Sequence, residues 1–208
     1  MTEQEWFECA DVESMVRSLP AKVSERKRRL FGCACCRQVP SLFRDKQVVK
    51  ALEAAEKFAD RRVVQATCAR WIRVVRKLEA TFPPAPNGYA WQMAYAAVCS
   101  TLHHAAYGSV YYFIIAAAEA AKLKIHPLAE LLRDIVSNPW RPRPRRSFPD
   151  HILGLAENCY AAFPEISDEY LILADALDEL GEVQAAEHCR QGQHARGCHI
   201  LDWILRKK

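Results

Sequence analysis

Apolar side chains recur at helical spacing along most of this chain. The clearest example is the range 45–59, where the apolar positions are Val48, Val49, Leu52, Ala55 and Phe58. Residues three and four apart lie on one face of an α-helix, so this pattern predicts an amphipathic helix with one face in a core. The same pattern predicts helices over the ranges 25–38, 62–82, 126–136, 150–163, 183–190 and 195–206.

Residues that favour helix ends agree with this pattern. Thr2 and Glu5 have the form of a capping box, which predicts a short first helix anchored by Trp6. Further N-caps are predicted at Asp11, Ser24 and Ser167, and helix ends near Pro20, Pro40, Gly181 and Gly192.

The range 88–118 contains no Asp, Glu, Lys or Arg and is long enough to cross a bilayer. Polar residues interrupt it, however, and no unbroken apolar run approaches membrane length. We therefore expect two buried helices separated near Gly108 and no transmembrane segment. Residues 110–115 are of strand-forming types, but they show no alternation of apolar and polar positions, so helix is the preferred prediction.

No other segment predicts a strand, so we expect an all-α protein, an irregular multi-helix bundle of about eight to eleven helices. Four prolines between Ser137 and Pro149 favour an extended segment. The predicted organisation is an N-terminal helical bundle over 1–138, a Pro/Arg-rich linker over 139–149 and a C-terminal helical unit over 150–208 that docks on the N-terminal helices. A single domain overall is the alternative.

Composition narrows the class of protein. Apolar residues make up 50% and charged residues 26%, as in folded domains, and the formal charge of +4 permits an acidic partner without requiring one. The acidic start Met1–Trp6 lacks the basic end and apolar run of a signal peptide, so we expect a cytoplasmic protein. The chain is cysteine-rich, with nine cysteines, and the reducing cytosol argues against a disulfide framework.

Cysteine and histidine residues gather in two short segments that suggest a metal site. Cys33 and Cys36 are three residues apart and share one face of a predicted helix, while Cys189, His194 and Cys198 lie in the segment 188–199. Zinc takes four thiolate or imidazole ligands in a tetrahedron, and two distant pairs can build such a closed site. We therefore predict a structural zinc ion that joins the N- and C-terminal segments. The alternative is that these cysteines pack as small buried residues.

Two other kinds of chemistry stay open. Cys198, at a predicted helix start near His194 or His188, has the surroundings of an activated thiol in a metal- or thiol-dependent enzyme. Arginines interleaved with aromatic residues can hold phosphates and stack on bases, which favours a nucleic-acid-binding protein. The arginines that carry this second hypothesis are Arg70, Arg73, Arg141, Arg143, Arg145 and Arg146. The alternative for them is a solvated face and an exposed linker.

Several motifs resemble those of an uncharacterised bacterial family of all-helical proteins. They are the start Met1–Trp6, the Leu-Phe-x-Cys-x-Cys-Cys-Arg segment 30–37, the Leu-Arg-Asp-Ile segment 132–135, His-Cys-Arg at 188–190 and His-x-Arg-Gly-Cys at 194–198. His199 stands where the family pattern has Trp. The resemblance implies a helical fold and transfers no activity.

The sequence contains no phosphate-binding loop, no credible carboxylate pair and no catalytic-triad spacing, so no catalytic residue is predicted. We expect a non-catalytic cytoplasmic binding or adaptor protein that acts through protein interaction. The two alternatives are a nucleic-acid-binding protein and a metal- or thiol-dependent enzyme.

Overall fold

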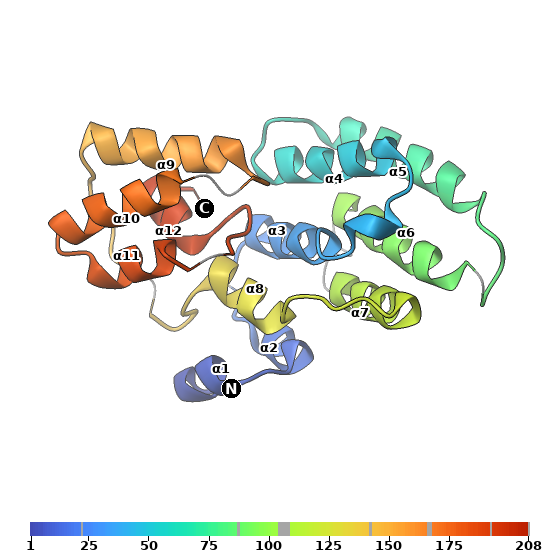
Figure 1. The fold of residues 1–208 in the computed structure, drawn as a ribbon, viewed down its shortest axis with the longest axis horizontal. Helices are drawn as coiled ribbons and strands as arrows, with labels where there is room; N and C mark the ends of the chain where they lie inside the picture. The colour runs from blue at the N-terminus through green and yellow to red at the C-terminus, as the bar shows by residue number, and fades with distance from the viewer. Residues whose placement is uncertain are drawn as a thin grey trace. The chain divides into compact units, whose positions relative to one another are not determined.

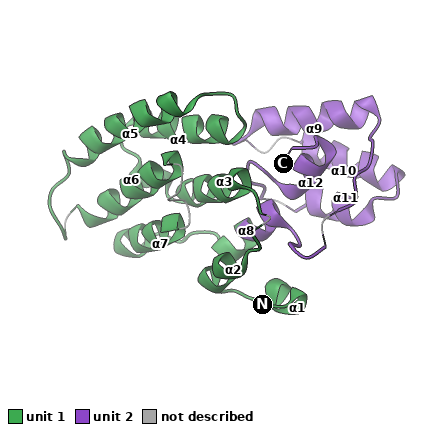
Figure 2. Cartoon of the chain, turned by 180° about the vertical axis from the view of Figure 1, so that it is seen from behind, with its two compact units in different colours: residues 1–131 green, residues 132–208 purple. Residues whose placement is uncertain are grey.

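A computed structural model describes residues 1–21, 23–86, 88–103, 109–141, 143–165, 168–191 and 193–207 (Figure 1). The described residues form twelve α-helices, ten of them with seven or more residues, together with one 3-10 helix and no strand. The prediction of an all-α, irregular multi-helix protein is therefore confirmed. The chain divides into two compact units, unit 1 over 1–131 and unit 2 over 132–208 (Figure 2).

Unit 1 is built around helix α3, which packs against α4, α6 and α7. Gly32 of α3 lets α7 approach closely, because a Cβ atom there would lie 3.3 Å from Val110 Cγ2. The helices of unit 1 are α1 (Glu3–Glu8), α2 (Val12–Ser18), α3 (Glu25–Cys36), η1 (Pro40–Leu42), α4 (Lys46–Ala59), α5 (Gln65–Glu79), α6 (Tyr89–Leu102) and α7 (Val110–Ala121). Helix α8 (Leu128–Val136) contains the division between the units.

The helix starts follow the predicted caps. Thr2 and Glu5 form the capping box of α1, Asp11 accepts hydrogen bonds from the backbone amides of residues 13 and 14, and Ser24 accepts one from Lys27. These side chains satisfy amides that have no partner inside the first helical turn. The predicted break near Gly108, the cap at Ser167 and the helix end at Gly192 lie outside the described residues.

The uncharged range 88–118 contains α6 and most of α7, which pack against each other. The strand-forming residues 110–115 lie in α7, as the preferred prediction has it. Among the described residues, no helix combines the length and the apolar character needed to cross a membrane.

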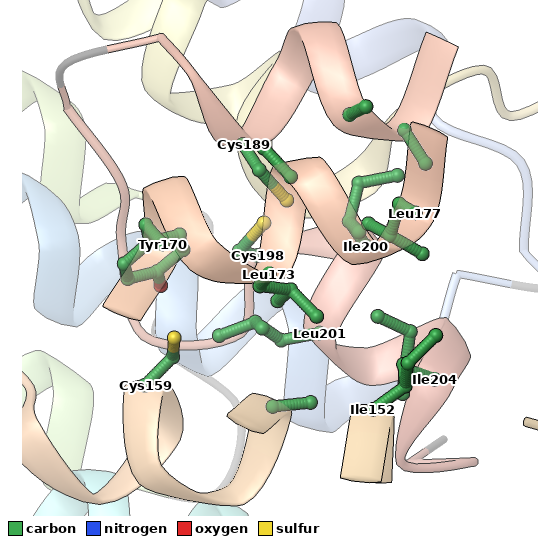
Figure 3. Close-up of a cluster of buried hydrophobic side chains, with 14 of the residues drawn as sticks. Ile152, Cys159, Tyr170, Leu173, Leu177, Cys189, Cys198, Ile200, Leu201 and Ile204 are labelled. Carbon is green, nitrogen blue, oxygen red and sulfur yellow. The ribbon is translucent and has the colours of Figure 1, made fainter. Parts of the chain in front are cut away.

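Unit 2 contains four further helices around one hydrophobic core (Figure 3). They are α9 (Asp150–Ala162), α10 (Glu169–Glu179), α11 (Val183–Cys189) and α12 (His199–Ile204). Helix α9 packs against α10 and α12, and α10 packs against α11. The labelled core side chains of Figure 3 come from all four helices and from Cys198, directly before α12.

The Pro/Arg-rich segment 139–149 lies in unit 2 and contacts its last helix. Trp203 Nε1 donates a hydrogen bond of 2.7 Å to the carbonyl of Pro144, and the buried Phe148 ring meets the Trp203 ring edge to face at 4.7 Å. Its described residues form no helix, as its prolines lead one to expect, yet its contacts tie it to the core. The three-part division of the chain and the docking of its C-terminal part stay predictions.

Candidate metal centre

Unit 2 brings four metal-ligating side chains together at one point. Their ligand atoms all lie within 4.8 Å of one another. The four residues, called the ligand cluster below, are Asp134, His188, His194 and Cys198. Among the residues that the structure describes, this is the one group of three or more His, Cys, Asp or Glu side chains with such close ligand atoms.

The distances within the ligand cluster suit a small cation. His188 Nε2 lies 2.9 Å from Asp134 Oδ1 and 3.2 Å from Cys198 Sγ. His194 Nδ1 lies 3.2 Å from the same Asp134 oxygen. Ligand atoms that surround zinc tetrahedrally at about 2.0 to 2.3 Å are about 3.3 to 3.8 Å apart. The cluster could therefore hold a metal ion after small side-chain adjustments.

Local backbone structure brings the two ends of the segment 188–198 to this point. His188 lies in the last turn of α11, and Cys198 is the N-cap of α12. Gly197 has a φ of 91°, which only glycine adopts readily, and the amide of Cys198 donates to the carbonyl of Ala195 at 2.9 Å. The resulting turn places Cys198 beside His188.

Asp134 connects α8 to this segment through both of its oxygens. Oδ1 faces the two histidines, while Oδ2 accepts a hydrogen bond of 2.7 Å from the amide of Ala195. This second bond fixes the carboxylate and leaves Oδ1 directed at the other ligands. In metal sites, hydrogen-bond partners of the ligand residues orient the ligands in this way.

His194 is held on two sides. Its Nε2 lies 3.3 Å from the carbonyl of Cys189, and its ring stacks on Tyr170 with centroids 4.3 Å apart and planes inclined by 5°. A carbonyl only accepts, so this contact places the ring hydrogen on Nε2. A neutral His194 then has the lone pair of Nδ1 directed at the centre of the ligand cluster, which is the tautomer that a metal requires; with a second proton, Nδ1 donates to Asp134 instead.

Burial makes this group of charges costly on its own. Burial raises the pKa of Asp134, but hydrogen bonds from His188 and His194 and their charges outweigh it and hold the pKa below its ordinary value. Burial, with the nearby charge of Asp134, raises the pKa of Cys198 well above that of a free thiol. Asp134 is 7% exposed and Cys198 is fully buried, so the cluster contains an ionised carboxylate away from water.

The structure brings two of the five predicted metal ligands, His194 and Cys198, into the ligand cluster. Cys189 contributes its carbonyl to His194, while its sulfur points toward that of Cys198 in the core (Figure 3). Burial, aided by Cys159 and Asp134, raises the pKa of Cys189 to about 12.

The other two predicted ligands, Cys33 and Cys36, are buried in α3 of unit 1. Burial raises the pKa of each well above the ordinary value. A metal role for these two and for Cys189 stays a prediction.

Sequence reasoning missed two members of the ligand cluster. The sequence indicates His188 only as a base for Cys198, and Asp134 only as part of the segment 132–135. A signal for Asp134 was present, because it follows Leu131 by three residues and precedes Ile135, both buried in α8. A carboxylate beside the apolar face of a helix needs a buried partner. His199, which was not predicted as a ligand, has its ring 4.4 Å from that of His188 and is not in the cluster.

The same geometry bears on the activated-thiol hypothesis. In a catalytic triad, the histidine contacts the nucleophile through one ring nitrogen and the carboxylate through the other. Here Cys198 Sγ and Asp134 Oδ1 both face Nε2 of His188. The three groups therefore converge on one point instead of forming a proton relay.

The six predicted nucleic-acid contacts fall into two sets. Arg70 and Arg73 are exposed on α5, and Arg141 and Arg145 are exposed in the segment 139–149. The remaining two are engaged within unit 2: Arg143 lies 5.1 Å from the centre of the Trp203 ring, and Arg146 forms an ion pair with Glu182.

Comparison of the chain with protein-family models, with curated proteins and with solved structures gives no match. The function is therefore inferred from the ligand cluster and the charged surfaces.

Proposed function

We propose that this chain is a non-catalytic helical binding protein whose C-terminal unit is stabilised by a structural zinc ion. The ligand cluster would hold the ion through one carboxylate, two imidazoles and one thiolate. The convergence of the four ligand atoms within 4.8 Å, in a buried place, is the observation that supports the proposal. Zinc accepts this mixture of oxygen, nitrogen and sulfur ligands.

Charge supports a divalent cation in particular. The carboxylate of Asp134 and the thiolate of Cys198 contribute two negative charges, and two neutral imidazoles contribute none. A divalent ion neutralises this set completely, which removes the cost of a buried net charge. Metal binding also removes the thiol proton, because a coordinating thiol is deprotonated by the ion.

The contacts of His194 are compatible with a bound cation. Its Nε2 can donate to the carbonyl of Cys189 while Nδ1, 3.2 Å from Asp134 Oδ1, gives its lone pair to the ion. Without an ion, a proton on Nδ1 makes the contact with Asp134 a hydrogen bond, so a cation and a proton compete for this position.

The burial of the ligands supports a structural role over a catalytic one. Structural zinc sites have four protein ligands, whereas catalytic sites leave one position to water or substrate. The ligand cluster supplies four, and its thiol has no access to solvent. The function of the protein would then lie on its helical surface, and the ion would stabilise the unit that carries part of that surface.

Metal analysis of the purified full-length protein tests the proposal. We expect about one equivalent of zinc in protein prepared without chelators, since a closed four-ligand site binds tightly. Replacement of zinc by Co²⁺ should give the visible absorption of a tetrahedral ion with a thiolate ligand. Less than about half an equivalent of any transition metal would contradict the proposal.

A matched pair of variants identifies the ligand. Cys198 and Cys159 are both buried thiols of the same core, but only Cys198 belongs to the ligand cluster. We expect Cys198→Ala to lose zinc and Cys159→Ala to keep it, although both lose a packed side chain. Equal zinc content in the two folded variants would remove Cys198 from the site.

A further inference from the structure

Helices α4 and α5 of unit 1, with the turn between them, expose charges of one sign only. We call the range 46–81 the basic hairpin. Every exposed charged side chain in it is a lysine or an arginine, and there are nine of them: Lys46, Lys50, Lys57, Arg61, Arg62, Arg70, Arg73, Arg76 and Lys77. The two helices pack side by side (Figures 1 and 2).

None of the four acidic residues of the basic hairpin is exposed: Glu56 is buried, and Glu53, Asp60 and Glu79 are partly buried. Glu56 is buried and accepts a pair of hydrogen bonds from Arg37, at 2.7 and 2.9 Å. Asp60, with a side chain 1% exposed, pairs with Arg26 at 3.0 Å. Arg26 lies in α3 and Arg37 directly follows it, so Glu56 and Asp60 are paired with cations outside the hairpin, while the partly buried Glu79 has Arg76 of the hairpin nearby. The outer surface keeps its positive charge.

The cations follow the helices at regular spacing. Lys46, Lys50 and Lys57 are separated by four and seven residues on α4, and Arg70, Arg73 and Lys77 by three and four on α5. Such spacings place side chains on one face of a helix. Each helix is about 20 Å long, a length of duplex that carries about a dozen phosphates.

Positive charge is not spread evenly over the surface of this chain. The range 150–187 in unit 2 contains no lysine or arginine. Its exposed charges are all acidic, at Asp150, Glu157, Glu165, Asp168, Asp175, Glu179 and Glu187. The formal charge of +4 therefore conceals two regions of opposite sign, and the basic hairpin is a local concentration of positive charge.

We propose that the basic hairpin binds the phosphodiester backbone of a nucleic acid. Five of its nine cations are arginines, whose planar groups form paired hydrogen bonds with phosphate. An anionic membrane fits less well: the apolar faces of α4 and α5 are buried in unit 1, and Val64, 69% exposed, is the one large apolar side chain exposed in the hairpin. Contacts to phosphates alone carry no base sequence information, so the binding is independent of sequence.

This inference rests on the proposed binding function and names nucleic acid as the partner. It depends on residues of unit 1 and not on the zinc ion. It is tested by the fluorescence anisotropy of a labelled DNA duplex of about 20 base pairs, titrated with the full chain at about 50 and 200 mM salt. An RNA duplex of the same sequence distinguishes the two nucleic acids. Zinc content measured on the same samples separates failure of this inference from failure of the zinc proposal.

Two double variants provide the comparison. Arg70→Gln with Arg73→Gln removes two charges from the basic hairpin, and Lys122→Gln with Lys124→Gln removes two exposed charges elsewhere in unit 1. We expect the first to weaken binding by about one to two orders of magnitude and to reduce the salt slope by about 2. The second should bind nearly as the parent does. Thermal melting checks that both are folded.

Three results would overturn the inference. One is no binding of either duplex at low salt, where phosphate contacts are strongest. Another is equal weakening in the two double variants, which would assign any binding to net charge alone. The third is capture by vesicles containing phosphatidylserine, or self-association, that depends on Arg70 and Arg73 while the duplexes do not bind.

Discussion

Two groups of buried thiols in this protein have the same burial and different neighbours. Cys33, Cys35 and Cys36 of α3 are at most 1% exposed, and Cys198 is equally buried. The α3 thiols share their helix with apolar residues and have the ion pair of Arg37 and Glu56 nearby, whereas Cys198 has His188 Nε2 at 3.2 Å. Burial raises the pKa of all four, so neither burial nor pKa distinguishes them.

The difference between these groups lies in the number of ligand atoms that converge. A thiol among apolar side chains behaves as a small hydrophobic residue. A thiol beside two imidazoles and a carboxylate belongs to a set that a divalent ion can neutralise. Substitutions and removal of the ion can test whether Cys198 is a ligand and the α3 thiols are core residues.

The largest effect is expected for Asp134→Asn. The change preserves the shape of the side chain but removes the negative charge that faces both histidines. Removing one partner from a buried set of charges lowers the free energy of unfolding by about 3 to 5 kcal/mol. We also expect the variant to lose zinc. Chemical unfolding followed by circular dichroism gives the loss in free energy.

The matched control is Asp175→Asn. This carboxylate is 76% exposed and pairs with Arg190 at 2.7 Å. An exposed ion pair contributes at most about 1 kcal/mol, so this variant should keep its zinc and nearly all of its stability. Equal effects of the two substitutions would contradict a special role for Asp134.

Removal of the ion by a chelator is expected to have the next largest effect. A ligand at a hundred times its dissociation constant stabilises the folded state by about 2.7 kcal/mol, and at a thousand times by about 4 kcal/mol. For a unit of this size, the melting temperature should fall by about 10 °C or more. Scanning calorimetry with and without chelator measures the shift.

The same experiment on Asp134→Asn provides a control. If the variant has already lost its ion, the chelator should leave its melting temperature unchanged, because the two effects share one cause. A chelator that lowers the melting temperature of both proteins equally would place the ion elsewhere.

A smaller effect is expected for Tyr170→Leu. The ring stacks on His194 at 4.3 Å and restricts its orientation, and groups that orient a ligand typically contribute 10- to 100-fold to metal affinity. We expect about a tenfold loss in zinc affinity, measured by competition with a chromogenic chelator. Tyr160→Leu is the control, because Tyr160 is buried in the same core and its ring faces Arg196 and Lys207. A tenfold loss in both variants would assign the effect to core packing.

The helices could be predicted from sequence because their signals are local. The spacing of apolar residues and caps such as Thr2, Asp11 and Ser24 depends on neighbours within a few residues, and the structure has these caps. The contacts of the segment 139–149 could not be predicted in this way. Its prolines indicate extended backbone, but they do not reveal that Pro144 accepts a hydrogen bond from Trp203, 59 residues later.

The ligand cluster was predicted only in part for the same reason. His194 and Cys198 lie in one unusual motif, whereas Asp134 is 54 residues before His188 and 60 before His194. The meeting of α8 with this loop depends on how the helices of unit 2 pack, and no local pattern reports such packing. A buried carboxylate on an apolar helix is the one local sign that such a partner exists.

The smallest effect is expected for Cys36→Ala, and it tests the α3 thiols directly. Removal of one buried sulfur from a packed helix should cost about 1 kcal/mol and leave zinc content unchanged. Cys198→Ala removes the same group and should lose the ion, so zinc analysis of the two proteins separates packing from ligation. Loss of zinc from Cys36→Ala would instead support the ligand role that the sequence predicts for Cys33 and Cys36. The comparison would then fail, because a thiol with apolar neighbours in its own helix would still be a metal ligand.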